Sequence, residues 1–263
     1  MLKALQVAVC QVGDGVVMPF FHKAARLPKA DGSTLTEADI AAQAALEPAL
    51  RAILDVPLLG EEMTREEQQA SWDDGAEGVW VVDPIDGTAN FANGMPYFSL
   101  AVALVRHGKP VLGVVYAPAL GEMFSAELGK GAWRNGERLP LNPQVPVLSD
   151  ALAGVDFKRL PAGFGEVLAR EHPFYSQRNL GSAALEICYV ASGSLDIYLH
   201  GGLMLWDFAA ASLILDEAGG QAGRLELPAE SDFWSGDVFR KSVVAGKTPG
   251  LFQTWHAWLA AKR

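Results

Sequence analysis

The sequence predicts an α+β fold in which helices and sheets are stacked as layers. Apolar residues make up 50% of the 263 positions and charged residues 20%, as is usual for a globular protein with a full core. Short β-branched stretches and stretches of helical periodicity are mixed along the chain. They do not follow the strict strand–helix–strand order of a doubly wound parallel sheet. The mixture therefore favours a layered α+β architecture.

The first half of the chain is predicted to contain two helices and an antiparallel sheet. Apolar spacing predicts a largely helical segment over residues 2–26 and a second helix that begins after Thr36. Thr36 stands three residues before Asp39, as in a capping box. Strands are expected at 57–60, 79–82, 97–106, 110–117 and 122–126, and a hairpin is expected at Asn135-Gly136. The polar segment 64–78 would be a solvated helix or a loop.

The second half is predicted to begin after a proline-rich segment. Residues 140–149 show no periodicity, so we expect two lobes, 1–144 and 145–263. Strands are expected at 151–156 and 195–199, and helices at 164–171, 181–192 and 208–218, with a final helix that contains Trp255 and Trp258. Gly219-Gly220 would end the helix over 208–218.

Charge and cysteine content exclude several classes of protein. The formal net charge of −10 argues against a nucleic-acid or anionic-membrane partner, because both require a basic face. Cys10 and Cys188 lie far apart in apolar runs, which predicts two buried free thiols and a cytoplasmic location. Gln6 and Gln11 interrupt the apolar N-terminal run, which argues against a signal peptide. The five scattered histidines lack the spacing of a zinc site.

The clearest chemical signal is a pair of carboxylates, Asp83 and Asp86, directly after the apolar run 79–82. Pro84 and Gly87 predict a turn at the end of this strand, on which the two carboxylates can converge. Their repulsion is about 1 kcal/mol at ~4 Å in water and about 4 kcal/mol at an effective dielectric of about 20. A cation between them removes this cost, so the pair indicates a hard-metal site with oxygen ligands. Alone, either Asp could simply shape a turn.

Two more acidic residues occupy comparable places. Glu61 follows a predicted strand, and Asp207 stands at the start of a predicted helix. Taken singly, Glu61 is typical of surface charge and Asp207 of a helix N-cap.

Three segments taken together resemble the signature of the inositol monophosphatase family. They are residues 60–62 (GEE), 83–88 (DPIDGT) and 206–211 (WDFAAA), and their order and separation match the family. The flanking segments 36–39 and 216–220 also match, so that the resemblance runs from about residue 28 to 220. It implies a layered α/β/α/β/α sandwich of the inositol monophosphatase and fructose-1,6-bisphosphatase type. It also implies a homodimer and sensitivity to lithium.

The same resemblance implies a magnesium-dependent phosphomonoesterase with two to three Mg²⁺ per active site. Glu61, Asp83 and the backbone carbonyl of Ile85 would hold one ion, and Asp83, Asp86 and Asp207 would hold a second. The four carboxylates total −4, and the metals would largely neutralise them, so that an acidic protein can accept a phosphate group.

A third, weaker magnesium would lie near Glu61, with its water shell reaching toward Asp39. Lys29 belongs to a segment that resembles the loop closing over the metals in this family, although a solvated hairpin tip explains it equally well. Gly87 and Thr88 would begin a helix whose N–H groups bind the phosphate. The resemblance gives the Thr88 hydroxyl and Glu61 the task of orienting a metal-activated water for in-line attack.

The substrate is expected to be a small polyol phosphate, inositol monophosphate first. Gly181 and Ser182 resemble the segment near the substrate alcohol. His200 stands where inositol-preferring members carry an acidic residue, and its neighbours in sequence include no carboxylate. Histidinol phosphate, a sugar phosphate and 3′-phosphoadenosine 5′-phosphate stay open, although the segment 62–82 is short for a nucleotide-type member. The alternative class is a non-catalytic protein retained for binding or assembly.

Overall fold

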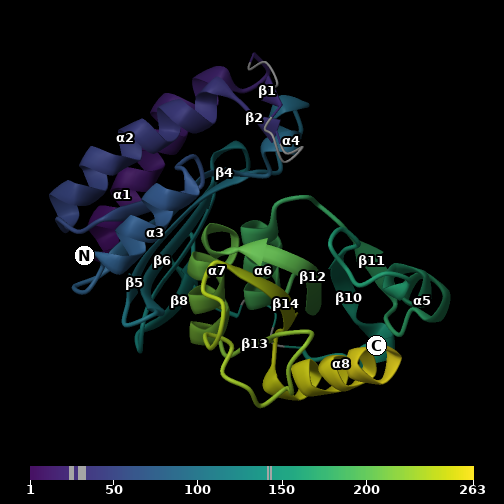
Figure 1. Ribbon diagram of the computed structural model, residues 1–263. Coiled ribbons are helices and arrows are strands. Elements are labelled where there is room, and N and C mark those ends of the chain that lie inside the picture. Colours follow the sequence, from purple (N-terminus) through teal and green to yellow (C-terminus); the bar gives the residue numbers. More distant parts are fainter. Residues whose placement is uncertain (24–26, 29–33, 141, 143) are drawn as a thin grey trace.

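Two large β-sheets form the framework of the molecule in the computed structural model, which describes residues 1–23, 27–28, 34–140, 142 and 144–263 (Figure 1). Over these residues the first sheet has seven strands, in the order β3-β4-β5-β6-β7-β8-β9, and the second has five, in the order β11-β10-β12-β14-β13. The first comprises β3 (Leu58–Gly60), β4 (Val79–Asp86), β5 (Ser99–Arg106), β6 (Lys109–Ala117), β7 (Glu122–Glu127), β8 (Gly131–Arg134) and β9 (Glu137–Arg138). The second comprises β10 (Leu152–Asp156), β11 (Ser176–Arg178), β12 (Ile197–Met204), β13 (Gln221–Gly223) and β14 (Arg240–Gly246), and β1 (Leu27–Pro28) pairs separately with β2 (Thr34–Leu35).

Helices cover the faces of both sheets. The α-helices are α1 (Leu2–Val12), α2 (Glu37–Ile53), α3 (Arg65–Asp73), α4 (Thr88–Ala92), α5 (Phe164–Glu171), α6 (Ala183–Ser192), α7 (Leu205–Glu217) and α8 (Pro249–Lys262). α1 and α2 pack on one face of the seven-stranded sheet, and α6 and α7 lie between the two sheets. α5 and α8 cover the outer face of the five-stranded sheet. These five layers confirm the layered α/β/α/β/α sandwich.

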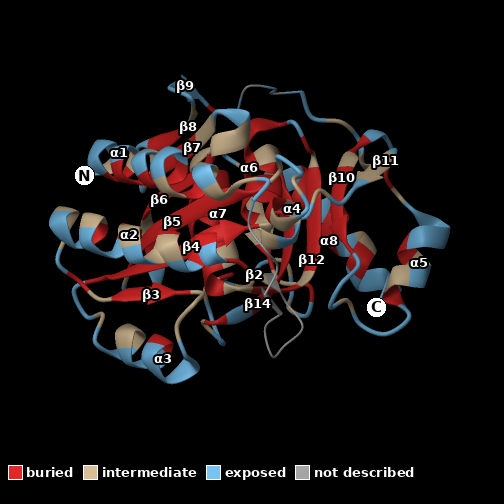
Figure 2. Ribbon diagram, turned by 90° about the horizontal axis from the view of Figure 1, so that it is seen from above, coloured by how far each residue is buried: buried red, intermediate tan, exposed pale blue. Residues whose placement is uncertain are grey.

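The alternation of side chains along β4 shows why the sheet is covered on both faces. Trp80 and Val82 belong to the core with α1 and α2, whereas Val79 and Val81 belong to the core with α6 and α7. α7 is the central helix, and Figure 2 shows it buried along with strands β4 to β6. In β6, a Cβ on Gly113 would lie 2.8 Å from the carbonyl oxygen of Ala210, so the missing side chain allows α7 to approach the sheet closely.

Several local expectations are confirmed. The N-terminal segment is helical from Leu2 to Phe20, with a π-helical stretch at Gly13–Val17 and a 3₁₀ turn at Met18–Phe20. Asn135 and Gly136 have φ angles of 50° and 85° and connect β8 to β9 as a tight hairpin. The segment 64–78 takes the helical alternative as α3.

Other expectations are wrong in detail. The strand predicted at 79–82 continues through Asp86, and the one predicted at 195–199 runs from Ile197 to Met204. Cys188 is buried, but Cys10 is only half-buried and donates to Asp14. None of the described helices is both long and apolar enough to cross a bilayer.

The predicted lobes share a core. α6 and α7 come from the second half of the sequence, yet they pack against the sheet formed by the first half. The division into 1–144 and 145–263 stays a prediction.

Candidate active site

One cavity of about 380 Å³ collects the four predicted carboxylates from both halves of the chain. Glu61 follows β3, Asp83 and Asp86 lie in β4, and Asp207 lies in α7. The parallel pairing of β3 with β4 places Glu61 beside Asp83, because the Glu61 N–H donates to the Val82 carbonyl at 3.1 Å. The other residues around this cavity are Ile85, Gly87, Thr88, Ala89, Lys158, Arg159 and Gly181.

A bulge in β4 brings Asp83 and Asp86 to the same side of the strand. In a regular strand, residues three apart point to opposite faces. Here Asp83 pairs with Ala101 and Asp86 with Ser99, so three steps along β4 match two steps along β5. The extra residue restores a common direction for the two carboxylates. The predicted turn is therefore a bulged strand, and the bulge achieves the convergence for which the turn was proposed.

Hydrogen bonds from neighbouring groups fix Asp83 and Asp86. Asp83 Oδ1 accepts from the Ile85 N–H at 3.0 Å. Asp86 Oδ2 accepts from the Ser182 hydroxyl at 2.6 Å and from the Ala184 N–H at 2.8 Å. Each bond occupies one carboxylate oxygen and restricts rotation of the side chain.

Asp207 has a structural role at the start of α7. It is the third residue of the helix, and its Oδ2 accepts from the Met204 N–H at 2.8 Å. The N-cap interpretation of Asp207 is therefore wrong in position, because Met204 is the N-cap residue and Asp207 bonds back to it from inside the first turn. One carboxylate oxygen makes this bond, and the residue also lines the cavity.

Burial and neighbouring negative charge disfavour the ionised forms of the three aspartates. Burial raises the pKa of Asp83 well above its ordinary value, and the charges of Glu61 and Asp86 raise it further. Burial likewise raises the pKa of Asp207, with further contributions from Asp86 and Glu61. Burial raises the pKa of Asp86 to about 6 despite the hydrogen bonds from Ser182 and Ala184. Burial, with added repulsion from neighbouring carboxylates, therefore favours the protonated forms of the three aspartates.

Gly87 connects the carboxylate strand to α4. Its φ of 91° lies in the left-handed region, and an added Cβ would lie 3.1 Å from the carbonyl oxygens of both Gly181 and Tyr97. The chain thus needs glycine here for its backbone angle and for the close approach of the 181–182 segment. Ser182 is fully buried, and its hydroxyl is directed to Asp86 rather than to the cavity. Its role as a substrate contact stays a prediction, as does that of Gly181.

Thr88 and Asp39 meet at the edge of the cavity. The Thr88 hydroxyl lies 2.9 Å from the Ile85 carbonyl oxygen and 3.4 Å from Asp39 Oδ1. The other Asp39 oxygen accepts from the Thr36 N–H and hydroxyl, which confirms the capping box. The Thr88–Asp39 contact was not predicted from the sequence. Lys29 lies outside the described residues.

A smaller cavity of about 160 Å³ adjoins the carboxylate cavity and contains His200. His200 Nδ1 accepts from the Gly202 N–H at 3.0 Å, and burial lowers the pKa of the imidazole to about 4. Asp156 and Glu186 line the same cavity, so carboxylates distant in sequence do surround His200. Burial raises the pKa of Glu186 to about 7.

Both carboxylates near His200 had a recognisable signal in the sequence. Glu186 interrupts an otherwise apolar helix between Leu185 and Ile187, and Asp156 ends a predicted strand. A charged residue in either place would normally face solvent, whereas here both side chains are buried.

The chemistry of the donor set fits magnesium. Four carboxylate residues and Ile85 line one cavity, and Mg²⁺ prefers oxygen ligands. Burial and mutual repulsion raise the pKa values of the aspartates, and a divalent cation would offset both by stabilising the ionised carboxylates. Among the residues that the structure describes, no three Asp, Glu, His or Cys side chains stand in an arrangement that already forms a metal-binding group. The fit therefore rests on the donor chemistry and on the shared cavity.

The site is an acidic cavity in a five-layer sandwich. Its carboxylates come from a bulged strand, a helix start and the end of a second strand. The sequence profile of the inositol monophosphatase family matches residues 4–262. The chain belongs to this family.

Individual relatives agree with the family assignment. An inositol-1-monophosphatase of Mesorhizobium japonicum is 39% identical over 160 residues, which cover 59% of this chain and 60% of the relative. The Nus factor SuhB of Haemophilus influenzae is 42% identical over 145 residues, 54% of each chain. These matches span little more than half the length of the curated relatives. The solved structure of an inositol monophosphatase of Thermotoga maritima is 29% identical, with a TM-score of 0.84 over 99% of this chain and 96% of that one.

Proposed function

We propose that the protein is a magnesium-dependent phosphomonoesterase that hydrolyses a small polyol phosphate, with inositol monophosphate as the first candidate. The observation that supports this proposal best is the convergence of Glu61, Asp83, Asp86 and Asp207 on one cavity. Membership of the inositol monophosphatase family supports the reaction class.

The proposed metal ligands are those that the family resemblance implies, and all of these residues line the cavity. Glu61, Asp83 and the Ile85 carbonyl would hold one Mg²⁺, while Asp83, Asp86 and Asp207 would hold another, with two to three ions in all. Bound magnesium supplies positive charge for the phosphate oxygens and lowers the pKa of water. Without that charge, a dianionic phosphate would be repelled by the carboxylates.

The protein's own groups would then position the reactants. The Thr88 hydroxyl has one proton and two acceptors, Ile85 and Asp39, within reach, so its oxygen can accept a hydrogen bond from the attacking water. Gly87 and Thr88 would offer main-chain N–H groups to the phosphate at the start of α4. Lys158 and Arg159 line the same cavity and add positive charge at its wall.

The adjoining cavity suits a leaving alcohol that has several hydroxyl groups. His200, Asp156 and Glu186 provide both donors and acceptors of hydrogen bonds, and Gly181 lines both cavities. An imidazole with its pKa lowered to about 4 is neutral at pH 7, so His200 would not attract a further anionic group by charge. Lys158 and Arg159 line this cavity as well as the carboxylate cavity, so the support for a polyol comes from the hydrogen-bonding groups of His200, Asp156 and Glu186 and not from an absence of positive charge.

Assembly and inhibition are proposed from the family. We infer a homodimer, lithium sensitivity and action in the cytoplasm. Met95 is 50% exposed and is a candidate dimer contact, whereas its neighbour Phe98 is in the core. Sedimentation of the parent protein and of Met95→Glu tests the dimer, which would dissociate if this surface forms the interface.

Replacement of Asp207 by Asn tests the reaction. The amide oxygen can still accept from the Met204 N–H, so the fold should persist, while the charge needed for a metal is removed. We expect phosphate release to fall by at least about 100-fold at saturating Mg²⁺. The exposed Asp150→Asn variant is the control for loss of one charge. Full turnover by the Asp207 variant would contradict the assignment.

A panel of phosphate esters tests the substrate. Inositol 1-phosphate, histidinol phosphate, fructose 1,6-bisphosphate and 3′-phosphoadenosine 5′-phosphate should be compared by kcat/KM. A preference for inositol 1-phosphate is expected, and Glu186→Gln should reduce that preference more than it reduces the rate on a minimal phosphate ester. Absence of turnover on every ester would favour the alternative of a binding or assembly protein. The Haemophilus influenzae relative SuhB is named a Nus factor, which is consistent with the alternative of a binding or assembly protein.

A further inference from the structure

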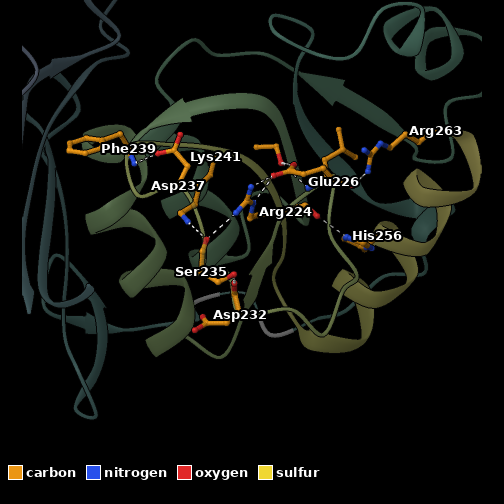
Figure 3. Close-up of polar contacts among 11 residues, drawn as sticks. Arg224, Glu226, Asp232, Ser235, Asp237, Phe239, Lys241, His256 and Arg263 are labelled. Atoms are coloured by element: carbon orange, nitrogen blue, oxygen red, sulfur yellow. Dashed lines mark hydrogen bonds and ion pairs between the residues drawn. The ribbon is translucent and has the colours of Figure 1, made fainter. Parts of the chain in front are cut away.

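The segment between β13 and β14 is held in place by a buried lysine and an arginine. Lys241 Nζ and Arg224 Nη1 both donate to the Ser235 carbonyl, at 2.8 and 3.0 Å, and Lys241 is only 2% exposed (Figure 3). Asp237 accepts from the Phe239 N–H at 2.9 Å at the end of the segment. Because Lys241 and Arg224 both donate to the Ser235 carbonyl, they hold the backbone of the segment between β13 and β14 in one conformation. These bonds to Ser235 and Asp237 fix the chain that leads into Phe239, and therefore the position of Phe239 itself.

The main chain of Phe239 contacts the helix that carries Asp207. The Phe239 carbonyl accepts from the N–H of Leu205 at 2.8 Å, and Leu205 is the first residue of α7. Asp207 follows two residues later. This bond satisfies one of the N–H groups that a helix leaves without an internal partner at its start. It ties the first turn of α7, and with it Asp207, to residue 239.

The side chain of Phe239 contacts a different helix, α3. The guanidinium carbon of Arg65 lies 3.6 Å from the centre of the Phe239 ring, a cation–π contact. The Trp72 ring packs against the same side chain, with ring centroids 6.0 Å apart. Arg65 and Trp72 lie in the first and last turns of α3, so the ring contacts both ends of this short helix.

α3 in turn holds the turn that contains Glu61. The buried Gln68 side chain donates to the Gly60 carbonyl at 3.0 Å and lies 3.3 Å from the Met63 carbonyl oxygen. Both carbonyls belong to the segment around Glu61. A displacement of α3 would therefore move the backbone on either side of the Glu61 carboxylate.

We propose that Phe239 is a positioning residue that sets the separation of Glu61 and Asp207 across the carboxylate cavity. Its carbonyl anchors α7, and its ring anchors α3. These two acids come from opposite halves of the chain and line the same cavity, and Phe239 contacts the helices next to both. The inference rests on the proposed function, because it concerns acids assigned to magnesium. Outer groups that orient metal ligands commonly change metal affinity by about 10–100-fold when they are removed.

Phe239→Ala, with Phe233→Ala as matched control, tests the proposal. Phe233 lies in the same segment and is similarly buried (8% against 6%). Its ring contacts Phe208 of α7, Trp234 and Lys241, whereas the Phe239 ring contacts Arg65 and Trp72 of α3, so the pair separates the contact with α3 from general packing of the segment. Mg²⁺ affinity is measured by titration calorimetry on the folded proteins, together with melting temperature. We expect Phe239→Ala to bind Mg²⁺ about tenfold more weakly and Phe233→Ala to stay within about twofold of the parent. Phe239→Tyr keeps the ring and should restore the affinity.

The outcomes separate the two proposals. Equal Mg²⁺ affinity in parent and Phe239→Ala, or equal weakening in both alanine variants, overturns the positioning role. A parent protein that binds no Mg²⁺ contradicts the proposed function instead. If Phe239→Ala does not fold, the exposed Arg65→Met variant takes its place. It should weaken Mg²⁺ binding by about threefold without unfolding, and unchanged affinity in that variant overturns the role.

Discussion

At the scale of single residues, the Ser182 hydroxyl determines how Asp86 faces the cavity. It donates one of two hydrogen bonds to the same carboxylate oxygen, and it also lies 3.3 Å from the Ser99 hydroxyl. Both serines are fully buried, so water cannot easily replace the bond. Ser182 was predicted from the sequence as a substrate contact, but its hydroxyl donates to Asp86, a proposed metal ligand.

Ser182→Ala should therefore reduce activity while the fold persists. A hydrogen bond to a charged group contributes about 1.5–3 kcal/mol, so kcat/KM should fall by roughly 10–100-fold. Ser192→Ala is the control, because Ser192 lies in the same helix region, is equally buried and donates to the Tyr189 carbonyl. Steady-state kinetics and thermal melts of both variants check this. Equal losses of activity in the two variants would contradict the role of Ser182.

Glu186 should make stability depend on pH. Burial raises its folded-state pKa to about 7 from an ordinary value of 4.5, so the folded state holds the proton more tightly. The free energy of unfolding should therefore fall as pH rises from about 4.5 to about 7 and then level off. Glu186→Gln lacks this term, so its stability relative to the parent should grow by about 2–3 kcal/mol between pH 5 and pH 8. Urea unfolding at both pH values measures the difference, and a constant difference would argue against a buried, protonated Glu186.

At the scale of elements, the junction of β4 and α4 is the most constrained part of the site. The bulge between Asp83 and Asp86 aligns the carboxylates, and Gly87 turns the chain directly afterwards into a helix of five residues. The 181–182 segment packs against this glycine from the other half of the molecule. Local backbone geometry and long-range packing therefore coincide at one residue.

Gly87→Ala should disturb both the backbone geometry of the β4–α4 junction and its packing against the 181–182 segment. A positive φ costs an alanine about 1–2 kcal/mol, and the two carbonyl oxygens at 3.1 Å must also move. We expect a loss of about 2–4 kcal/mol of stability and at least a tenfold loss of activity. Gly121→Ala is the control, since Gly121 has a φ of 63° but no atom within 4 Å of the added Cβ. That variant should lose stability alone, and similar losses of activity in both variants would contradict this account.

At the scale of the whole molecule, the charge of the site opposes folding unless a cation is bound. The carboxylates of both halves meet in one cavity, and burial raises the pKa values of Asp83 and Asp207. The protein as a whole carries a formal charge of −10, which adds to this repulsion. A ligand that binds only the folded state stabilises it in proportion to the logarithm of its concentration.

Mg²⁺ should therefore raise the melting temperature. At about 100 times the dissociation constant, the stabilisation is about 2.7 kcal/mol, or roughly 5–10 °C for a domain of this size. EDTA should reverse the shift, and Asp207→Asn should reduce it strongly. Thermal unfolding with and without the metal provides the measurement. An equal shift in the Asp207 variant would show that the metal stabilises the protein elsewhere.

Much of the fold was predictable because its causes are local. The Thr36–Asp39 capping box, the Asn135-Gly136 hairpin and the apolar strands depend on backbone preferences over a few residues. The strand bulge was not predictable, because its two sides are defined only by pairing with β5. The convergence of Asp83 and Asp86 was predicted nevertheless, but from a turn, because a turn and a bulge can both bring two nearby carboxylates to one side.

The sequence by itself determined which residue types were available and, through three short segments, the family to which they belong. Only the tertiary structure decided which of them meet. Glu61 and Asp207 share a cavity, Asp156 and Glu186 surround His200, and Phe239 contacts both helices next to the proposed ligands. The physical reason is the distance along the chain over which each interaction acts. Periodicity and capping act between neighbours along the chain, whereas cavities arise from the packing of layers that local preferences do not encode.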